Sequence, residues 1–232
     1  MQTSRKREKT RALRLFVDIF CGLAFLAMIG IFIGRAVSGT LGNRLAVLIA
    51  NSLLWLLPFV LRPIFREKIM ESVYAVFAVF TFFAALLGSV LGFYSRIWWY
   101  DLLMHTLFGY LGGIIGLFFA CKLSDINKLK PAFVMLVCFA VSMMFGALWE
   151  IFEFSGDVLL GNTAQGSHIT LPDGSVVTPL QDTMEDIICN FIGAIVFVLH
   201  YLAHILSKKS LLIGYMKDDF SPEINTVSSE KE

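Results

Sequence analysis

Residues 131–157 read PAFVMLVCFAVSMMFGALWEIFEFSGD, and this stretch decides the fold class. Residues 131–149 carry no charged side chain, which suits a membrane-spanning helix because such a helix needs about 20 mostly apolar residues. The stretch then ends with Glu150, Glu153 and Asp157. A charged side chain inside a spanning helix costs about 2.5 to 3.5 kcal/mol at the bilayer centre, so it is a candidate functional group. The stretch therefore predicts a transmembrane helix with a functional site at one end.

The rest of the chain has the same apolar character. Hydrophobic residues make up 57% of the chain and charged residues 16%, and the mean hydropathy is +0.74, which is typical of an integral membrane protein. Length and hydropathy predict six spanning helices, at 15–34, 45–61, 70–93, 98–121, 131–155 and 183–206. The predicted fold is therefore all-α: a polytopic membrane protein whose six-helix transmembrane bundle forms a single domain, 1–206. We expect the polar cytoplasmic tail, 207–232, to be disordered.

The distribution of basic residues predicts the orientation of this bundle. With the N-terminus in the cytoplasm, sixteen of the 19 Lys and Arg residues fall on the cytoplasmic side, and only Arg35, Arg44 and Arg96 fall outside. The positive-inside rule therefore predicts that both termini are cytoplasmic. The first apolar run is longer than that of a signal peptide and is followed by no small-x-small cleavage site, so we expect an uncleaved first helix.

The only long outer connection in this topology precedes the last helix. Within it, 167–171 and 175–178 flank the turn Pro172-Asp173-Gly174, which predicts a small external β-hairpin. We expect this hairpin to lie over the outer end of the bundle, where it would act as a lid.

Acidic residues of the fourth predicted helix lie on one face with small residues. Asp101, His105, Gly109, Gly112 and Gly116 follow one another at intervals of three or four residues, which places them on a single side of a helix. The glycines also form GxxxG spacings that allow another helix to approach closely. The Asp101 and His105 face is therefore expected to point at protein. The alternative for His105 taken alone is a hydrogen-bonded core histidine.

The fifth and sixth predicted helices repeat this arrangement at the same outer end. Glu150 and Glu153 are one turn apart in the fifth helix, and Asp182, Asp186 and Asn190 follow at intervals of four in the sixth. Neighbouring carboxylates repel one another, so a cation or a proton must lie between them. Two alternatives stay open, because the acidic end of the fifth helix is also compatible with exposure to water and Asp182 with a helix N-cap.

These side chains are expected to meet within about 10 Å of the outer surface, given a rise of 1.5 Å per residue. Oxygen ligands with one imidazole suit Mg, Mn, Ca or Zn and do not distinguish among them. The predicted metal ligands are His105, Glu150, Glu153, Asp182, Asp186 and Asn190. The predicted catalytic residues are Asp101, His105, Glu150, Glu153 and Asp186, with Asp101 orienting His105.

Two other residue groups lack the spacing of a metal or redox site. The four cysteines lie within apolar segments and form no CxxC pair, so we expect them to be small core residues. His200 and His204 are spaced as in HExxH, but the glutamate is missing. We expect both histidines near the inner membrane interface.

The ordered motifs over residues 70–206 resemble those of the YjdF-like bacterial inner-membrane proteins, a family of uncharacterised function. The motifs are Asp101-x-x-x-His105 with Gly109, then 148–154 (LWEIFEF), Gly161-Asn162-x-x-Gln165, Asp182-Thr183-x-x-Asp186 and Gly193-Ala194. The Asp-x-x-x-His segment is also similar to one in VanZ-like proteins, which are linked to glycopeptide tolerance and the cell envelope. The resemblance implies a multi-pass protein of the bacterial plasma membrane and names no reaction.

Three classes of function are compatible with these features. The first is a metal-dependent enzyme or binding protein that faces outward and acts on an envelope lipid or another amphiphile. The second is an ion-coupled transporter, although residues 191–199 of the sixth helix offer no ionisable group for a continuous polar path. The third is a structural or partner-binding membrane subunit. The bilayer is the expected partner, nucleic acid is not, and the sequence does not fix the oligomeric state.

Overall fold

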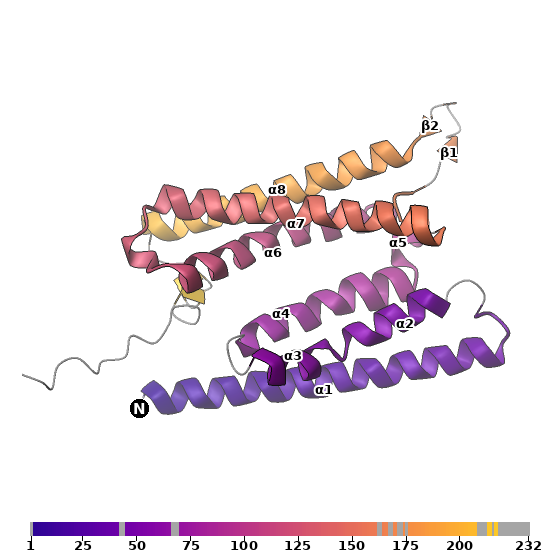
Figure 1. The fold of residues 1–232 in the computed structure, drawn as a ribbon, viewed down its shortest axis with the longest axis horizontal. Coiled ribbons are helices and arrows are strands. Elements are labelled where there is room, and N and C mark those ends of the chain that lie inside the picture. Colours follow the sequence, from indigo (N-terminus) through magenta and orange to yellow (C-terminus); the bar gives the residue numbers. More distant parts are fainter. Residues whose placement is uncertain are drawn as a thin grey trace, which may run out of the picture. The chain divides into compact units, whose positions relative to one another are not determined.

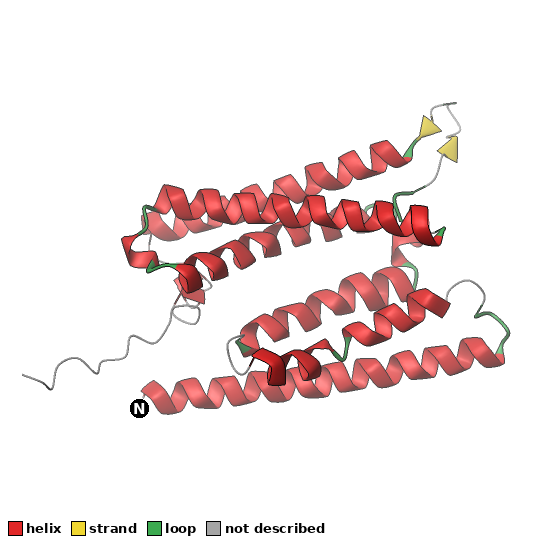
Figure 2. Cartoon of the chain, in the orientation of Figure 1, coloured by secondary structure: helices red, strands yellow, loops and turns green. Residues whose placement is uncertain are grey.

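The computed structural model describes residues 2–41, 45–65, 70–161, 164–166, 169–170, 174, 176–207, 213–214 and 216–217. Across these residues the chain consists of helices joined by loops, with one short ladder of two strands (Figure 1; Figure 2). Its contacts divide it into two units, Met1–Tyr100 and Asp101–Glu232, and each unit is described by itself. The single membrane domain over 1–206 therefore stays a prediction.

The first unit is built on one long helix. α1 packs against α2, α3 and α4, and the fully buried side chains Val17, Cys21 and Met28 of α1 meet the fully buried Trp55 and the buried Tyr74 in its core. The elements are α1 (Gln2–Val37), α2 (Leu45–Leu54), α3 (Leu57–Phe65), α4 (Glu71–Thr81), a π-helical segment (Phe82–Val90) and α5 (Phe93–Arg96).

The second predicted span, 45–61, is broken rather than continuous. α2 ends at Leu54 and α3 begins at Leu57, with the two axes bent by 46°. Pro58 explains the break, because its ring would clash with the carbonyl group of Leu54 in an uninterrupted helix. The prediction of one continuous helix over 45–61 is replaced by this bent pair, and the proline was the available signal.

An ion network fastens this bent pair to its neighbours. The Arg62 guanidinium on α3 donates to the Asp18 carboxylate on α1 and, over 2.7 Å, to Glu71 Oε2 on α4. The Arg62 side chain is only 12% exposed and also lies over the Tyr74 ring, 5.1 Å from its centroid. One arginine therefore joins three helices of the first unit.

The second unit is a bundle of three long helices, each in contact with the other two. They are α6 (Tyr100–Leu123), α7 (Pro131–Leu160) and α8 (Pro179–Ser207). Gly161 directly follows the last residue of α7 and caps the helix, and its positive φ of 66° favours glycine. α8 begins four residues earlier than predicted, because the Thr178 hydroxyl accepts a hydrogen bond from the Gln181 N–H over 3.2 Å and caps the helix.

Small residues let the three helices approach closely, as the spacing in the sequence predicts. A methyl group on Gly112 would lie 2.7 Å from Cα of Ser142, and one on Gly116 would lie 2.5 Å from Cα of Cys138. Ser142 is fully buried and donates a hydrogen bond to the Gly109 carbonyl oxygen over 2.7 Å. Interhelical contacts of this kind hold α6 against α7.

The number of long apolar helices indicates a multi-pass membrane protein. Within the described ranges, five helices are long and apolar enough to cross a membrane, and the bent pair α2–α3 makes a sixth if it is one span. The five are Thr10–Val37, Glu71–Val90, Tyr100–Leu123, Pro131–Leu159 and Pro179–Ser207. All four cysteines are free thiols, and Cys21, Cys121 and Cys138 are buried, as expected of core residues.

The expected external hairpin is reduced to a minimal ladder. β1 (Ile169–Thr170) pairs antiparallel with β2 (Val176–Val177), so that Ile169 faces Val177. The other residues of the expected hairpin and its turn, 167–168, 171–173 and 175, lie outside the described residues. The described part of the chain is thus helical with four strand residues, and the role of this segment as a lid stays a prediction.

Candidate functional site at one end of α6, α7 and α8

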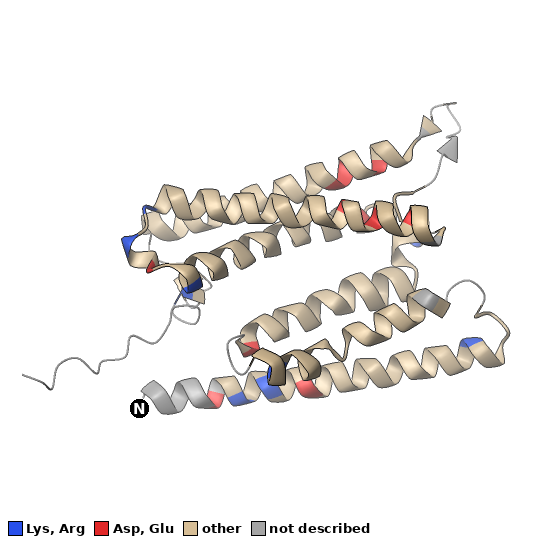
Figure 3. Ribbon diagram, in the orientation of Figure 1, with Lys and Arg blue, Asp and Glu red and all other residues tan. Residues whose placement is uncertain are grey.

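Acidic residues of the second unit gather at one end of its helices. Figure 3 shows the acidic stretches of α7 and α8 toward the end that carries β1 and β2, whereas the basic stretches of the α6–α7 connection lie at the opposite end. The segregation follows from the sequence, since Lys122, Lys128 and Lys130 flank that connection.

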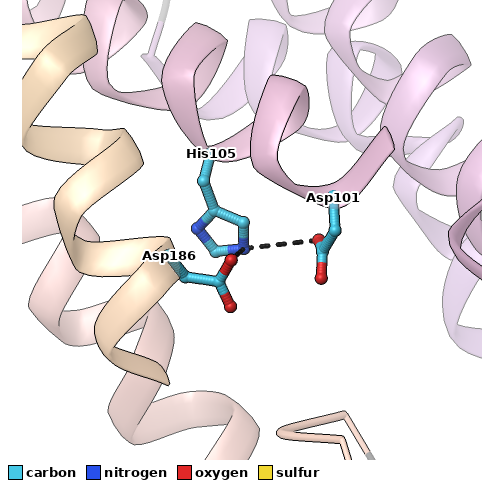
Figure 4. Close-up of side chains that lie close together, drawn as sticks. All are labelled: Asp101, His105 and Asp186. Carbon is cyan, nitrogen blue, oxygen red and sulfur yellow. Dashed lines mark ion pairs between the residues drawn. The ribbon is translucent and has the colours of Figure 1, made fainter. Parts of the chain in front are cut away.

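His105 lies at the centre of this acidic end. It projects from α6 one turn after Asp101, and its Nε2 lies 3.5 Å from Asp101 Oδ1 and 3.7 Å from Asp186 Oδ1 on α8 (Figure 4). On the other side of the ring, Nδ1 lies 3.8 Å from Glu150 Oε1 on α7. One imidazole therefore faces carboxylates from all three helices.

Two groups of three side chains have the proximity that a metal ion requires. The first is Asp101, His105 and Asp186, and the second is Glu150, Glu153 and Asp186. In each group, one ligand atom from every residue lies within 4.8 Å of the others. Asp186 belongs to both groups.

The inner members of the site are buried. Asp186 is 2% exposed, and His105 and Glu150 are each 6% exposed. The Oε2 atom of Glu150 is inaccessible to solvent and meets no geometric hydrogen-bond criterion with any described residue, although the Thr183 side chain on α8 interacts with the same carboxylate. Because an unpaired buried charge is costly, this oxygen calls for a proton or a cation.

Asn190 lies one turn beyond Asp186 on α8, and its buried Oδ1 has no hydrogen-bond partner among the described residues. It is 1% exposed, and its Nδ2 donates to the Ser142 carbonyl oxygen over 3.4 Å. A methyl group on Gly146 would lie 2.5 Å from that Nδ2, and one on Gly109 would overlap the Asn190 backbone. Asn190 thus packs all three helices together one turn from Asp186, and its predicted role as a ligand stays a prediction.

Asp182 belongs to neither group of potential ligands, and its predicted role as a ligand stays a prediction. It is half-buried, and a methyl group on Gly166 would lie 3.2 Å from its Oδ2, so its side chain faces the loop before α8. A helix period places Asp182 on the same face as Asp186, but it is one turn nearer the helix start. Its position in the first turn of α8 agrees with the alternative that it serves the helix start.

The loop after α7 is tied down by residues that the sequence analysis did not select as a site. Asp157 accepts hydrogen bonds from the backbone N–H groups of Ala164 and Gln165, over 2.7 and 2.9 Å. The Gln165 amide then donates to the Thr183 hydroxyl over 2.8 Å. This chain of contacts links the ends of α7 and α8 beside the carboxylates.

Trp149 is a further residue that the sequence analysis did not select. Its indole Nε1 donates a hydrogen bond to Glu153 Oε1 over 2.9 Å and thereby orients that carboxylate. The spacing of four residues on one helix was the signal that could have found it.

The two histidines of α8 lie outside the site. His200 Nδ1 is 2.7 Å from the Tyr110 hydroxyl, and the two rings are stacked with centroids 6.2 Å apart. Neither His200 nor His204 belongs to a group of potential metal ligands among the described residues. The absence of the HExxH glutamate agrees with this arrangement.

Comparison with known proteins gives a family. Over 138 residues the chain is 28% identical to a protein of Thermotoga maritima that is described as uncharacterized, and this match covers 59% of the chain and 65% of that relative. The chain thus spans somewhat less than two thirds of the relative's length. No solved structure matches. The model of the family described as "Predicted membrane protein (DUF2238)" matches residues 19–207, so the chain belongs to this family of predicted membrane proteins.

Proposed function

We propose that this chain is a multi-pass protein of the bacterial plasma membrane that binds a divalent cation between α6, α7 and α8 and acts there on an envelope amphiphile. The observation that carries the proposal is the second ligand group, in which Glu150, Glu153 and Asp186 offer oxygens within 4.8 Å of one another. Glu150 adds a buried Oε2 without a hydrogen-bond partner among the described residues.

Electrostatics favour a cation at this position. Two unit charges 4 Å apart interact by about 4 kcal/mol at an effective dielectric near 20, so three adjacent carboxylates strongly oppose one another when ionised. A divalent ion removes that repulsion, and carboxylate oxygens are the ligands that Mg, Mn and Ca prefer, while the imidazole also suits Zn.

The surrounding residues have separate roles in this proposal. Asp101 orients His105 through the contact at Nε2, and Trp149 holds Glu153 by its indole hydrogen bond. A water molecule bound to the cation would be the nucleophile, because a divalent ion lowers the pKa of its bound water.

An amphiphile suits the location of the site. The acidic end of α7 carries large apolar side chains beside the carboxylates, and Ile151, Phe152 and Phe154 are all exposed. A lipid could place its chains along this apolar surface while its polar group reaches the carboxylates. In the orientation that the basic residues predict, with both termini cytoplasmic, this end faces outward.

Divalent-ion binding by purified protein tests the proposal. After chelator treatment, detergent-solubilised wild type should gain thermal stability with Mg, Mn, Ca or Zn, by about 2.7 kcal/mol at an ion concentration 100 times Kd. Asp186→Asn should abolish the gain and Glu150→Gln should reduce it, and both should unfold at a higher temperature than ion-free wild type because each removes a repelling charge.

Glu185→Gln is the matched control. Glu185 precedes Asp186 on α8 but is exposed, and its Oε1 accepts a hydrogen bond from Gln181 Nε2 over 2.8 Å. This variant should respond to ions as wild type does. A wild-type protein that responds to none of the four ions would show that the carboxylates form a protonated hydrogen-bond network instead.

A further inference from the structure

We infer that the site holds two divalent cations, one on each side of the His105 ring, with Asp186 shared between them. The inference rests on the proposed function and adds the number of ions and the division of the ligands. The first position comprises Asp101, His105 and Asp186, and the second comprises Glu150, Glu153 and Asp186. With a cation on His105 Nε2, Asp101 acts as a ligand beside His105 instead of orienting the ring by a contact at that nitrogen.

The size of the two groups favours one ion in each. Metal–oxygen bonds of about 2.0 to 2.6 Å allow ligand atoms on opposite sides of one ion to be about 4 to 5 Å apart. The ligand atoms of each group lie within 4.8 Å of one another. Among the described residues, two groups of three meet this limit of 4.8 Å. The five residues taken together do not form one group within the same limit.

The imidazole ring separates the two positions. His105 Nε2 faces Asp101 and Asp186, at 3.5 and 3.7 Å, whereas Nδ1 faces Glu150 at 3.8 Å. Figure 4 shows the Nε2 side, with Asp101 from the same helix and Asp186 approaching from α8. The two nitrogens of an imidazole point in different directions, so a single ion cannot contact both.

The charge of the ligands also favours two divalent cations. The two groups contain four different carboxylates, Asp101, Glu150, Glu153 and Asp186, and neutral His105 adds no charge. Two divalent ions neutralise four carboxylates, whereas one leaves two negative charges around the buried Glu150 and Asp186.

A buried oxygen independently indicates a ligand in the second position. The Glu150 side chain is 8% exposed, and its Oε1 is the atom that faces His105. Its Oε2 is shielded from solvent and has no hydrogen-bond partner in the described part of the chain. A cation between Glu150, Glu153 and Asp186 would give this oxygen a partner.

Counting manganese ions tests the inference. The full chain, purified in detergent, is dialysed against Mn²⁺, and the metal in the monodisperse fraction is measured by elemental analysis. We expect two ions per chain in wild type and in Glu185→Gln, one in Asp101→Asn, one in Glu153→Gln, and fewer than one in Asp186→Asn. Electron paramagnetic resonance gives a second readout, because two adjacent Mn²⁺ ions couple, whereas the single-position variants should show an uncoupled six-line signal.

The outcomes separate this inference from the proposed function. One ion per chain with an uncoupled signal in wild type would overturn the two-ion centre and leave the proposed cation site intact. No bound ion would overturn both. Should a variant fail to fold, the wild-type stoichiometry and its spectrum still decide the question.

Discussion

Gly193 on α8 offers a direct test of the packing that builds the site. A methyl group at this position would overlap the Thr106 carbonyl oxygen and would lie 2.8 Å from the Tyr110 backbone nitrogen. Both are backbone atoms of α6, so no side-chain rotation can relieve the overlap. The two helices must therefore separate. Overpacking of this kind costs about 1 to 3 kcal/mol, offset by about 0.5 to 1 kcal/mol from the better helix propensity of alanine.

Thermal unfolding in detergent measures the effect of Gly193→Ala. For a chain of this size each kcal/mol lowers Tm by about 2 to 4 °C, so the net cost of about 0 to 2.5 kcal/mol lowers Tm by up to about 10 °C. Gly30→Ala is the control, because no atom lies within 4 Å of a methyl group there and alanine should leave Tm unchanged or raise it. Equal Tm values for the two variants would refute the close approach of α6 and α8.

The same substitution should also weaken the cation site. Thr106 follows His105 in the chain, so moving α6 away from α8 lengthens the contact of 3.7 Å between His105 Nε2 and Asp186 Oδ1. Gly193→Ala should therefore need more divalent ion than wild type for the same thermal stabilisation. An unchanged ion dependence alongside a lower Tm would mean that the site does not depend on this helix contact.

Two further predictions concern the first unit and the orientation of the chain. Arg62→Met should destabilise the protein by about 3 kcal/mol, because Asp18 and Glu71 lose their shared partner; adding Asp18→Asn and Glu71→Gln should restore most of the lost Tm, and no recovery would contradict the network. In a variant without native cysteines, a cysteine at Val176 should react with an impermeant thiol reagent added to intact cells, whereas one at Ser124 should not, and the reverse pattern would invert the topology.

The sequence alone predicts much of the membrane architecture. Apolar length determines where a helix can span a bilayer, and the GxxxG spacing predicts the close contacts that Gly112 and Gly116 make with α7. The break before Pro58 was also readable from the sequence, because the steric effect of proline is local. The positions of Asp101 and His105 on one face follow from the helix period alone.

Which carboxylates meet was decided by the tertiary structure. The helix period places Asp182 and Asp186 on the same face of α8, yet only Asp186 lies beside His105, within 3.7 Å. That choice depends on how far α8 is shifted along α6, which the contacts of Gly193 and Asn190 fix. The sequence therefore determined the helices, their faces and their acidic ends, because these depend on neighbouring residues. Only the packing of α6, α7 and α8 decided that Asp186 is shared by two ligand groups, because axial shift and rotation depend on contacts between residues far apart in the chain.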